Sequence, residues 1–111
     1  MPLPNEPNGT TLLIVDDKPQ NLRLISDFLA EHGFDLMLTR SGPQALDKVR
    51  LATPDLVLLD VRMPDMDGFE VCRRLKGDPR TANIPVIFMT AVDDTAHKVE
   101  GFVLGAVDYI T

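Results

Sequence analysis

Residues 55–60 read Asp55-Leu56-Val57-Leu58-Leu59-Asp60, with four consecutive apolar residues between two aspartates. Apolar residues at every position, rather than at every second one, are typical of a strand that is covered on both faces, as in a parallel sheet. Pro54 precedes the run and a loop-forming stretch, 63–68, follows it, which keeps the run at strand length. The sequence therefore predicts a buried parallel strand that closes on Asp60.

Similar apolar runs recur along the chain and alternate with helical patterns. Further strands are predicted over residues 12–15, 34–39, 85–90 and 106–110. Helices are predicted from Pro19 to Gly33, from Ser41 to about Leu51, near 69–76, and from a cap at Asp93 or Asp94 to Gly105. The residues predicted to face inward are Leu22, Ile25, Phe28, Leu29, Ala45, Leu46, Val49, Leu51, Val99, Phe102 and Val103. Five buried strands alternating with helices indicate an α/β fold around a parallel sheet.

Length and composition limit the class of protein. The chain has 111 residues, 44% hydrophobic and 25% charged, which suits one soluble domain. A formal net charge of −6 argues against nucleic acid as a partner, and no run is long enough to span a membrane. Residues 1–9 hold three prolines and predict a flexible lead-in before a domain over 10–111. The single cysteine, Cys72, fits a packing residue in a reducing compartment, so the expected location is the cytoplasm.

Aspartates close two of the predicted strands. Asp16 and Asp17 follow the run 12–15, and Asp60 closes the run 55–60. Ligands of open α/β sheets gather beyond the carboxyl ends of the strands, so neighbouring strands would bring these three carboxylates together. Oxygen-only ligands select a hard cation such as Mg²⁺, with Mn²⁺ as a substitute. A carboxylate beside such an ion can attack phosphorus and form an aspartyl phosphate.

Several of the acidic residues and histidines have other interpretations. An aspartate at a strand end can be only a turn or capping residue. The stretch Asp65-Met66-Asp67-Gly68 resembles part of a calcium loop, but Met63 and Arg74 occupy positions where that loop needs acidic ligands. His32 and His97 lack metal-ligand spacing and are expected on the surface.

Four segments together resemble the receiver domain of bacterial response regulators. They are residues 12–17, 55–68, 84–91 and 105–111, in the order and at the spacing of that family, and the resemblance covers about residues 10–111. It implies a doubly wound, five-stranded parallel sheet of flavodoxin-like order 2-1-3-4-5. It also implies a domain that takes a phosphoryl group from a histidine kinase or a phosphotransfer protein and then switches a protein-binding face, rather than an enzyme that turns over a substrate.

The resemblance further implies a role for each matching residue. Asp60 corresponds to the phosphoacceptor, and the metal ligands are Asp17, Asp16 largely through water, Asp60 and the backbone carbonyl of Arg62. Thr90 corresponds to the hydroxyl that binds the new phosphoryl group. The remaining matches are Ala91, the small residue beside the phosphate, and Tyr109, the aromatic switch.

One departure from the family lies at the end of the sequence. The family places a lysine and a last helix after the fifth strand, whereas this chain ends at Thr111. Lys18 is a conceivable but disfavoured substitute for that lysine. An uncovered sheet would favour association into a homodimer. Two alternatives stay open at this point: a Mg²⁺-dependent phosphatase or phosphotransferase acting on small molecules, and a receiver-like module used only for docking.

Overall fold

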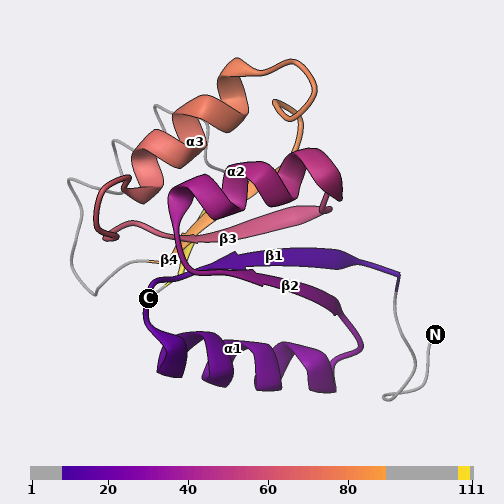
Figure 1. The fold of residues 1–111 in the computed structure, drawn as a ribbon. Helices are drawn as coiled ribbons and strands as arrows, with labels where there is room; N and C mark the ends of the chain where they lie inside the picture. The colour runs from indigo at the N-terminus through magenta and orange to yellow at the C-terminus, as the bar shows by residue number, and fades with distance from the viewer. Residues whose placement is uncertain (1–8, 90–107, 111) are drawn as a thin grey trace.

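The computed structural model describes residues 9–89 and 108–110, which form strands and helices in alternation (Figure 1). The strands are β1 (Thr11–Val15), β2 (Asp35–Thr39), β3 (Leu56–Asp60), β4 (Val86–Met89) and β5 (Asp108–Ile110). The helices are α1 (Pro19–Glu31), α2 (Gly42–Leu51) and α3 (Gly68–Gly77). The helix expected between Asp93 and Gly105, with His97, lies outside the described residues.

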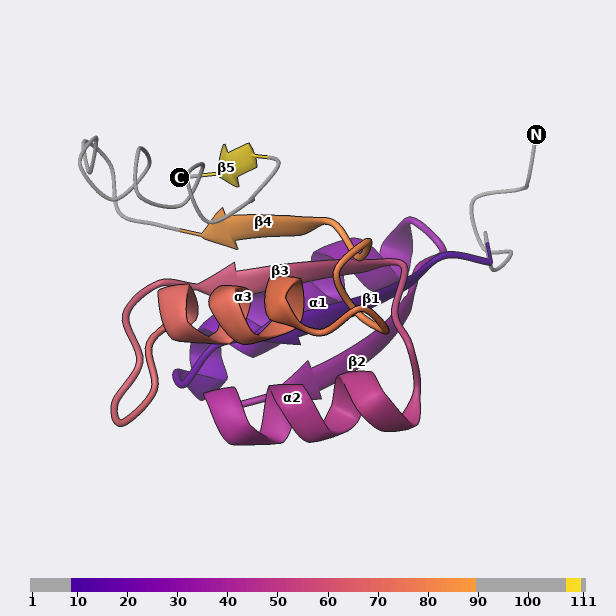
Figure 2. The same ribbon diagram turned by 90° about the horizontal axis from the view of Figure 1, so that it is seen from above.

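The strands form one parallel sheet in the order β2-β1-β3-β4-β5. The α/β class and the order β2-β1-β3-β4 are therefore confirmed, and β5 pairs with β4 along the far edge (Figure 2). The chain reverses its direction of winding at β1, since β2 lies on one side of it and β3 on the other. That reversal is the place in such sheets where ligands gather.

Helices cover both faces of the sheet. Helix α1 lies on one face, whereas α2 and α3 lie together on the other (Figure 1). Alternate residues of the strands face these two layers, as the pleat requires. Leu13, Leu59 and Phe88 belong to the core under α2 and α3, while Ile14 and Leu58 pack with Leu22 of α1. The continuous apolar runs of the sequence are thus explained by a sheet buried on both sides.

Local chemistry sets the helix ends close to the predicted positions. The Ser41 hydroxyl accepts a hydrogen bond from the Gln44 amide and caps α2. Pro19 opens α1, and Gly33 follows its end with a φ of 84°, a conformation that glycine adopts without strain. Cys72 is fully buried in α3, as expected of a packing residue, and its burial raises the pKa of the thiol.

Two residues predicted to face inward do not. Phe28 of α1 is 61% exposed and Leu51 of α2 is 85% exposed. Successive helical residues are about 100° apart, so Phe28 lies well off the stripe that buries Leu22, and Leu51 lies about 200° round from Val49. Both predictions were wrong because an apolar side chain is buried only where its position on the helix faces the sheet. His32 is exposed, as predicted. In the described part of the chain, no helix has the length and apolar character needed to cross a membrane.

Candidate functional site

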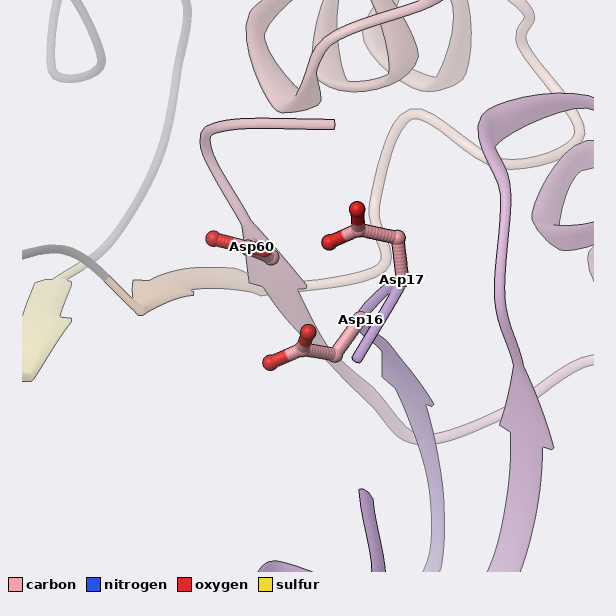
Figure 3. Close-up of side chains that lie close together, drawn as sticks. All are labelled: Asp16, Asp17 and Asp60. Carbon is pink, nitrogen blue, oxygen red and sulfur yellow. The ribbon is translucent and has the colours of Figure 1, made fainter. Parts of the chain in front are cut away.

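Three carboxylates meet at the carboxyl ends of β1 and β3. The two strands are parallel neighbours with Val15 opposite Leu59, so the residues that follow emerge at the same edge of the sheet. Figure 3 shows Asp16 and Asp17 just past β1 and Asp60 at the tip of β3. One oxygen from each of the three side chains lies within 4.8 Å of the others. The predicted convergence of these carboxylates is therefore confirmed.

Asp16 is held rigidly in this cluster. It is only 4% exposed, and its Oδ1 accepts a hydrogen bond from the backbone N–H of Lys18 at 2.9 Å. Its Oδ2 accepts a second bond from Nδ2 of Asn21 at 3.3 Å. Asn21 lies in the first turn of α1. Sequence reasoning missed Asn21, although a helix that begins at Pro19 places this amide near the strand end.

The two carboxylate oxygens of Asp60 differ in their hydrogen bonding within the described residues. Oδ1 accepts a hydrogen bond from the backbone N–H of Arg62 at 3.3 Å. Oδ2 is buried and has no hydrogen-bond partner in the described structure. Burial and then the neighbouring Asp16 charge raise the pKa of Asp60 to about 6, while the Arg62 amide and Lys18 oppose that rise. This carboxylate is buried, is repelled by a neighbouring negative charge and has lone pairs free to bind. A positive charge placed beside it would therefore be stabilising.

The ammonium group of Lys18 is in contact with two of the three carboxylates. Nζ of Lys18 is 3.4 Å from Oδ1 of Asp17 and 3.8 Å from Oδ2 of Asp60. The Asp60 charge is the main cause that raises the pKa of Lys18. Sequence reasoning considered Lys18 only as a disfavoured replacement for a family lysine and did not foresee these contacts.

The loop after Asp60 shapes the site without adding to the acidic cluster. Asp67 caps α3, because its Oδ1 accepts a hydrogen bond from the Glu70 amide at 2.9 Å. Asp65 turns the chain with a φ of 67°, which aspartate tolerates better than most residues. Gly68 lies against the Asp60 backbone so closely that no side chain fits there. Within the described ranges, Asp16, Asp17 and Asp60 are the one acidic group with metal-site geometry.

An open cavity of about 340 Å³ lies over the cluster. Asp16, Lys18, Asn21, Asp60 and Arg62 supply its polar lining, and Ile25, Val61 and Met89 supply the apolar part. A small anion therefore has a route to Asp60 from solvent.

The remaining predicted site residues are only partly located. Arg62 lies in the cavity lining. Tyr109 belongs to β5, where it pairs with Phe88 of β4, but the structure does not describe its side chain. Thr90 and Ala91 lie outside the described residues.

The donor set fits a divalent cation. The cluster offers carboxylate oxygens, and hard cations such as Mg²⁺ and Mn²⁺ prefer these ligands. Oδ2 of Asp60 accepts no hydrogen bond within residues 9–89 and 108–110, and the pKa of this carboxyl is raised; both indicate too little positive charge for three ionised groups. Such an ion would supply that charge and would polarise a bound phosphoryl oxygen.

Comparison with known proteins places residues 12–111 in the family model described as the response regulator receiver domain. The chain is 43% identical over 100 residues to the response regulator PleD of Caulobacter vibrioides. The matched segment covers 90% of this chain and 22% of PleD. It therefore spans about a fifth of that relative's length.

Solved structures agree with this comparison. The N-terminal domain of a response regulator receiver protein from Methanoculleus marisnigri matches with a TM-score of 0.86 at 36% identity, covering 93% of this chain and 84% of that one. The Mn²⁺-bound form of the response regulator Rcp1 matches with a TM-score of 0.84 at 26% identity, covering 92% and 80%.

Proposed function

We propose, because this chain belongs to the response regulator receiver domain family, that Asp60 is the residue that accepts the phosphoryl group. The observation that carries this assignment is the state of the Asp60 carboxylate. Its Oδ2 is buried and has no hydrogen-bond partner among the described residues; it lies beside Asp16 and Asp17, under an open cavity. The other two acids are less suited, since Asp16 has a hydrogen bond on each oxygen and Asp17 accepts one from Nζ of Lys18, whose contact with Asp60 is longer.

The proposed metal is Mg²⁺, with Mn²⁺ as a substitute. Asp17 and Asp60 would be direct ligands, Asp16 would act largely through water, and the backbone carbonyl of Arg62 would complete the protein donors. Mg²⁺ is usually bound by one or two carboxylates together with waters and phosphate oxygens, which matches this small donor set. The ion would neutralise charge on the transferred phosphoryl group.

The proposed reaction is transfer from a phosphohistidine. A carboxylate oxygen of Asp60 attacks phosphorus while the bond from phosphorus to the imidazole nitrogen breaks, and that nitrogen keeps the electron pair. Asp60 thereby becomes an acyl phosphate, which water later hydrolyses to inorganic phosphate. The protein is itself the acceptor, which hydrolysis restores, and not an enzyme that turns over a substrate.

Three further residues receive proposed roles from the resemblance to the family. Thr90 would donate its hydroxyl to the new phosphoryl group. Ala91 would leave room beside it, and Tyr109 would change its ring position when Thr90 moves. The added negative charge would thus alter a protein-binding face near β4 and β5.

The partner proposed from this chemistry is a histidine kinase or a phosphotransfer protein in the cytoplasm. The receiver domain is assigned to residues 10–111, with 1–9 as a lead-in. Association into a homodimer stays a prediction, and a clean monomer in light scattering at high protein concentration would contradict it.

Phosphoryl labelling tests the proposal directly. Incubation with acetyl phosphate and Mg²⁺ should add one phosphoryl group per chain, seen by intact mass, and Asp60→Asn should abolish it. Asp65→Asn is the matched control, because Asp65 is an exposed acid of the next loop and asparagine also tolerates its positive φ. Labelling that survives in Asp60→Asn would refute the assignment. Steady turnover of a phosphate ester would instead support a phosphatase.

A further inference from the structure

Lys18 occupies a position that local helix chemistry disfavours. It is the N-cap residue of α1 and makes no side-chain capping bond. That position favours short side chains with an acceptor oxygen, and the partial positive charge of a helix N-terminus disfavours a cation. A local rule broken in this way is expected where a residue serves a site rather than the helix.

The side chain of Lys18 is directed to the acidic cluster. Its ammonium forms a hydrogen bond and an ion pair with Asp17 and a longer ion pair with Asp60. The second contact is with Oδ2 of Asp60, the buried oxygen that has no hydrogen-bond partner in the described structure. Lys18 therefore supplies positive charge to the two carboxylates proposed as direct metal ligands.

Both partners hold the ammonium loosely enough for exchange. The Lys18 side chain is 50% exposed, compared with 28% for Asp17 and 15% for Asp60. Ion pairs with a half-exposed lysine are weak, because water competes for both charges. A divalent cation bound by the same carboxylates carries twice the charge and makes shorter contacts.

We propose that Lys18 is an internal counter-cation of this site, which competes with the divalent metal for Asp17 and Asp60 and must move aside when the metal binds. The inference rests on the proposed function, since it assumes that these carboxylates hold the metal. In this proposal Lys18 affects the affinity of the site for metal without being a ligand. The ammonium lowers the repulsion among the carboxylates before metal binds and is repelled by the bound ion afterwards.

The consequence for metal binding has a definite sign. Removal of the ammonium should strengthen Mg²⁺ binding, whereas loss of a true positioning residue would weaken it. Because the competing pairs are weak, we expect Lys18→Gln to lower the Mg²⁺ dissociation constant by about three- to tenfold. Lys18→Arg keeps the charge and should stay closer to the wild-type value.

General loss of positive charge must be separated from this local competition. Lys48→Gln removes the same charge from the exposed surface of α2, outside the cavity lining. At about 0.15 M ionic strength the screening length is about 8 Å, so a distant charge has little effect. We expect the Mg²⁺ dissociation constant of Lys48→Gln to differ from that of the wild type by less than about twofold.

The experiment is calorimetric titration of the chain and its variants with Mg²⁺. A second titration uses Mn²⁺, and its binding is measured by electron paramagnetic resonance. Tighter binding by Lys18→Gln, with Lys48→Gln unchanged, is the expected result. The melting temperature gives a second readout: Lys18→Gln should melt lower without metal and gain more from Mg²⁺ than the wild type. Equal or weaker binding by Lys18→Gln would overturn the inference.

A further variant separates this failure from failure of the proposed site. Asp60→Asn removes a proposed ligand and should weaken Mg²⁺ binding by about tenfold or more. If it does and Lys18→Gln has no effect, the site stands and the competition is refuted. If Asp60→Asn binds Mg²⁺ as the wild type does, the metal site itself is wrong and the inference falls with it.

Discussion

Gly68 lies against the backbone carbonyl of Asp60. A Cβ atom built at residue 68 would lie 2.3 Å from that oxygen and 3.0 Å from the Cα of Val61. The Gly68 amide also donates a hydrogen bond to the carbonyl of Val61 at 2.9 Å. The start of α3 is thus packed directly on the chain that carries Asp60, and the absence of a side chain at residue 68 permits this contact.

The first prediction follows from that contact. Gly68→Ala should destabilise the fold by about 1–3 kcal/mol, because the new methyl group meets backbone atoms that cannot rotate away. Gly77→Ala is the matched control, since a Cβ at the other end of α3 would meet nothing within 4 Å. Urea denaturation measures both variants. Equal stability of the two proteins would show that α3 shifts without cost.

A second prediction concerns the charge on Asp60 in metal-free protein. The raised pKa means that the ionised carboxylate is less stable in the folded chain than in the unfolded one. Asp60→Asn keeps the shape and removes the charge, so it should raise the free energy of unfolding at pH 7 by about 1–3 kcal/mol. Thermal melts in a chelator measure this change. A lower melting temperature for Asp60→Asn would contradict the electrostatic account.

A third prediction gives the pH dependence of the same group. Its folded pKa of about 6 exceeds the ordinary value of 3.8, so the folded state binds more protons between these two values. The stabilisation from protonated Asp60 should be complete below about pH 4 and should disappear as the pH rises through 6. Denaturation of metal-free wild type and Asp60→Asn across this window isolates the contribution. The difference in the free energy of unfolding between the two proteins should change with pH between about 4 and 6 and should level off above that range.

A fourth prediction tests Asn21 as a positioning residue. Its amide holds Oδ2 of Asp16, so Asn21→Ala should weaken Mg²⁺ binding by up to about tenfold while the fold persists. Gln20→Ala changes the exposed neighbouring residue and should have no such effect. Calorimetric titration gives the affinity and circular dichroism checks the fold. Unchanged affinity in Asn21→Ala would mean that the Lys18 amide alone orients Asp16.

Much of the fold was predictable because its signals are local. The apolar runs before Asp16 and Asp60 mark strands buried on both faces, and Ser41 and Gly33 mark helix ends through their own backbone chemistry. The inward-facing residues were less predictable. Phe28 and Leu51 are apolar, yet they are exposed, because burial depends on where each helix meets the sheet.

The site was predictable only in outline. Two strand ends that close on aspartate indicate convergence, provided that β1 and β3 are neighbours. The roles of Lys18 and Asn21 could not be inferred in the same way, since their partners are fixed by side-chain direction at the start of α1. Gly68 has the appearance of an ordinary loop glycine until the carbonyl of Asp60 is located beside it.

The sequence by itself determined the strands, most helix ends and the family, because repeating apolar patterns, caps and motif spacing are properties of neighbouring residues. Only the tertiary structure decided how closely Asp16, Asp17 and Asp60 approach one another, and that Lys18 lies between two of them. Those distances depend on the register of β1 against β3, two strands far apart in the chain. Within the part of the chain that the structure describes, the same packing leaves one Asp60 oxygen buried without a hydrogen bond, and no local pattern encodes that property.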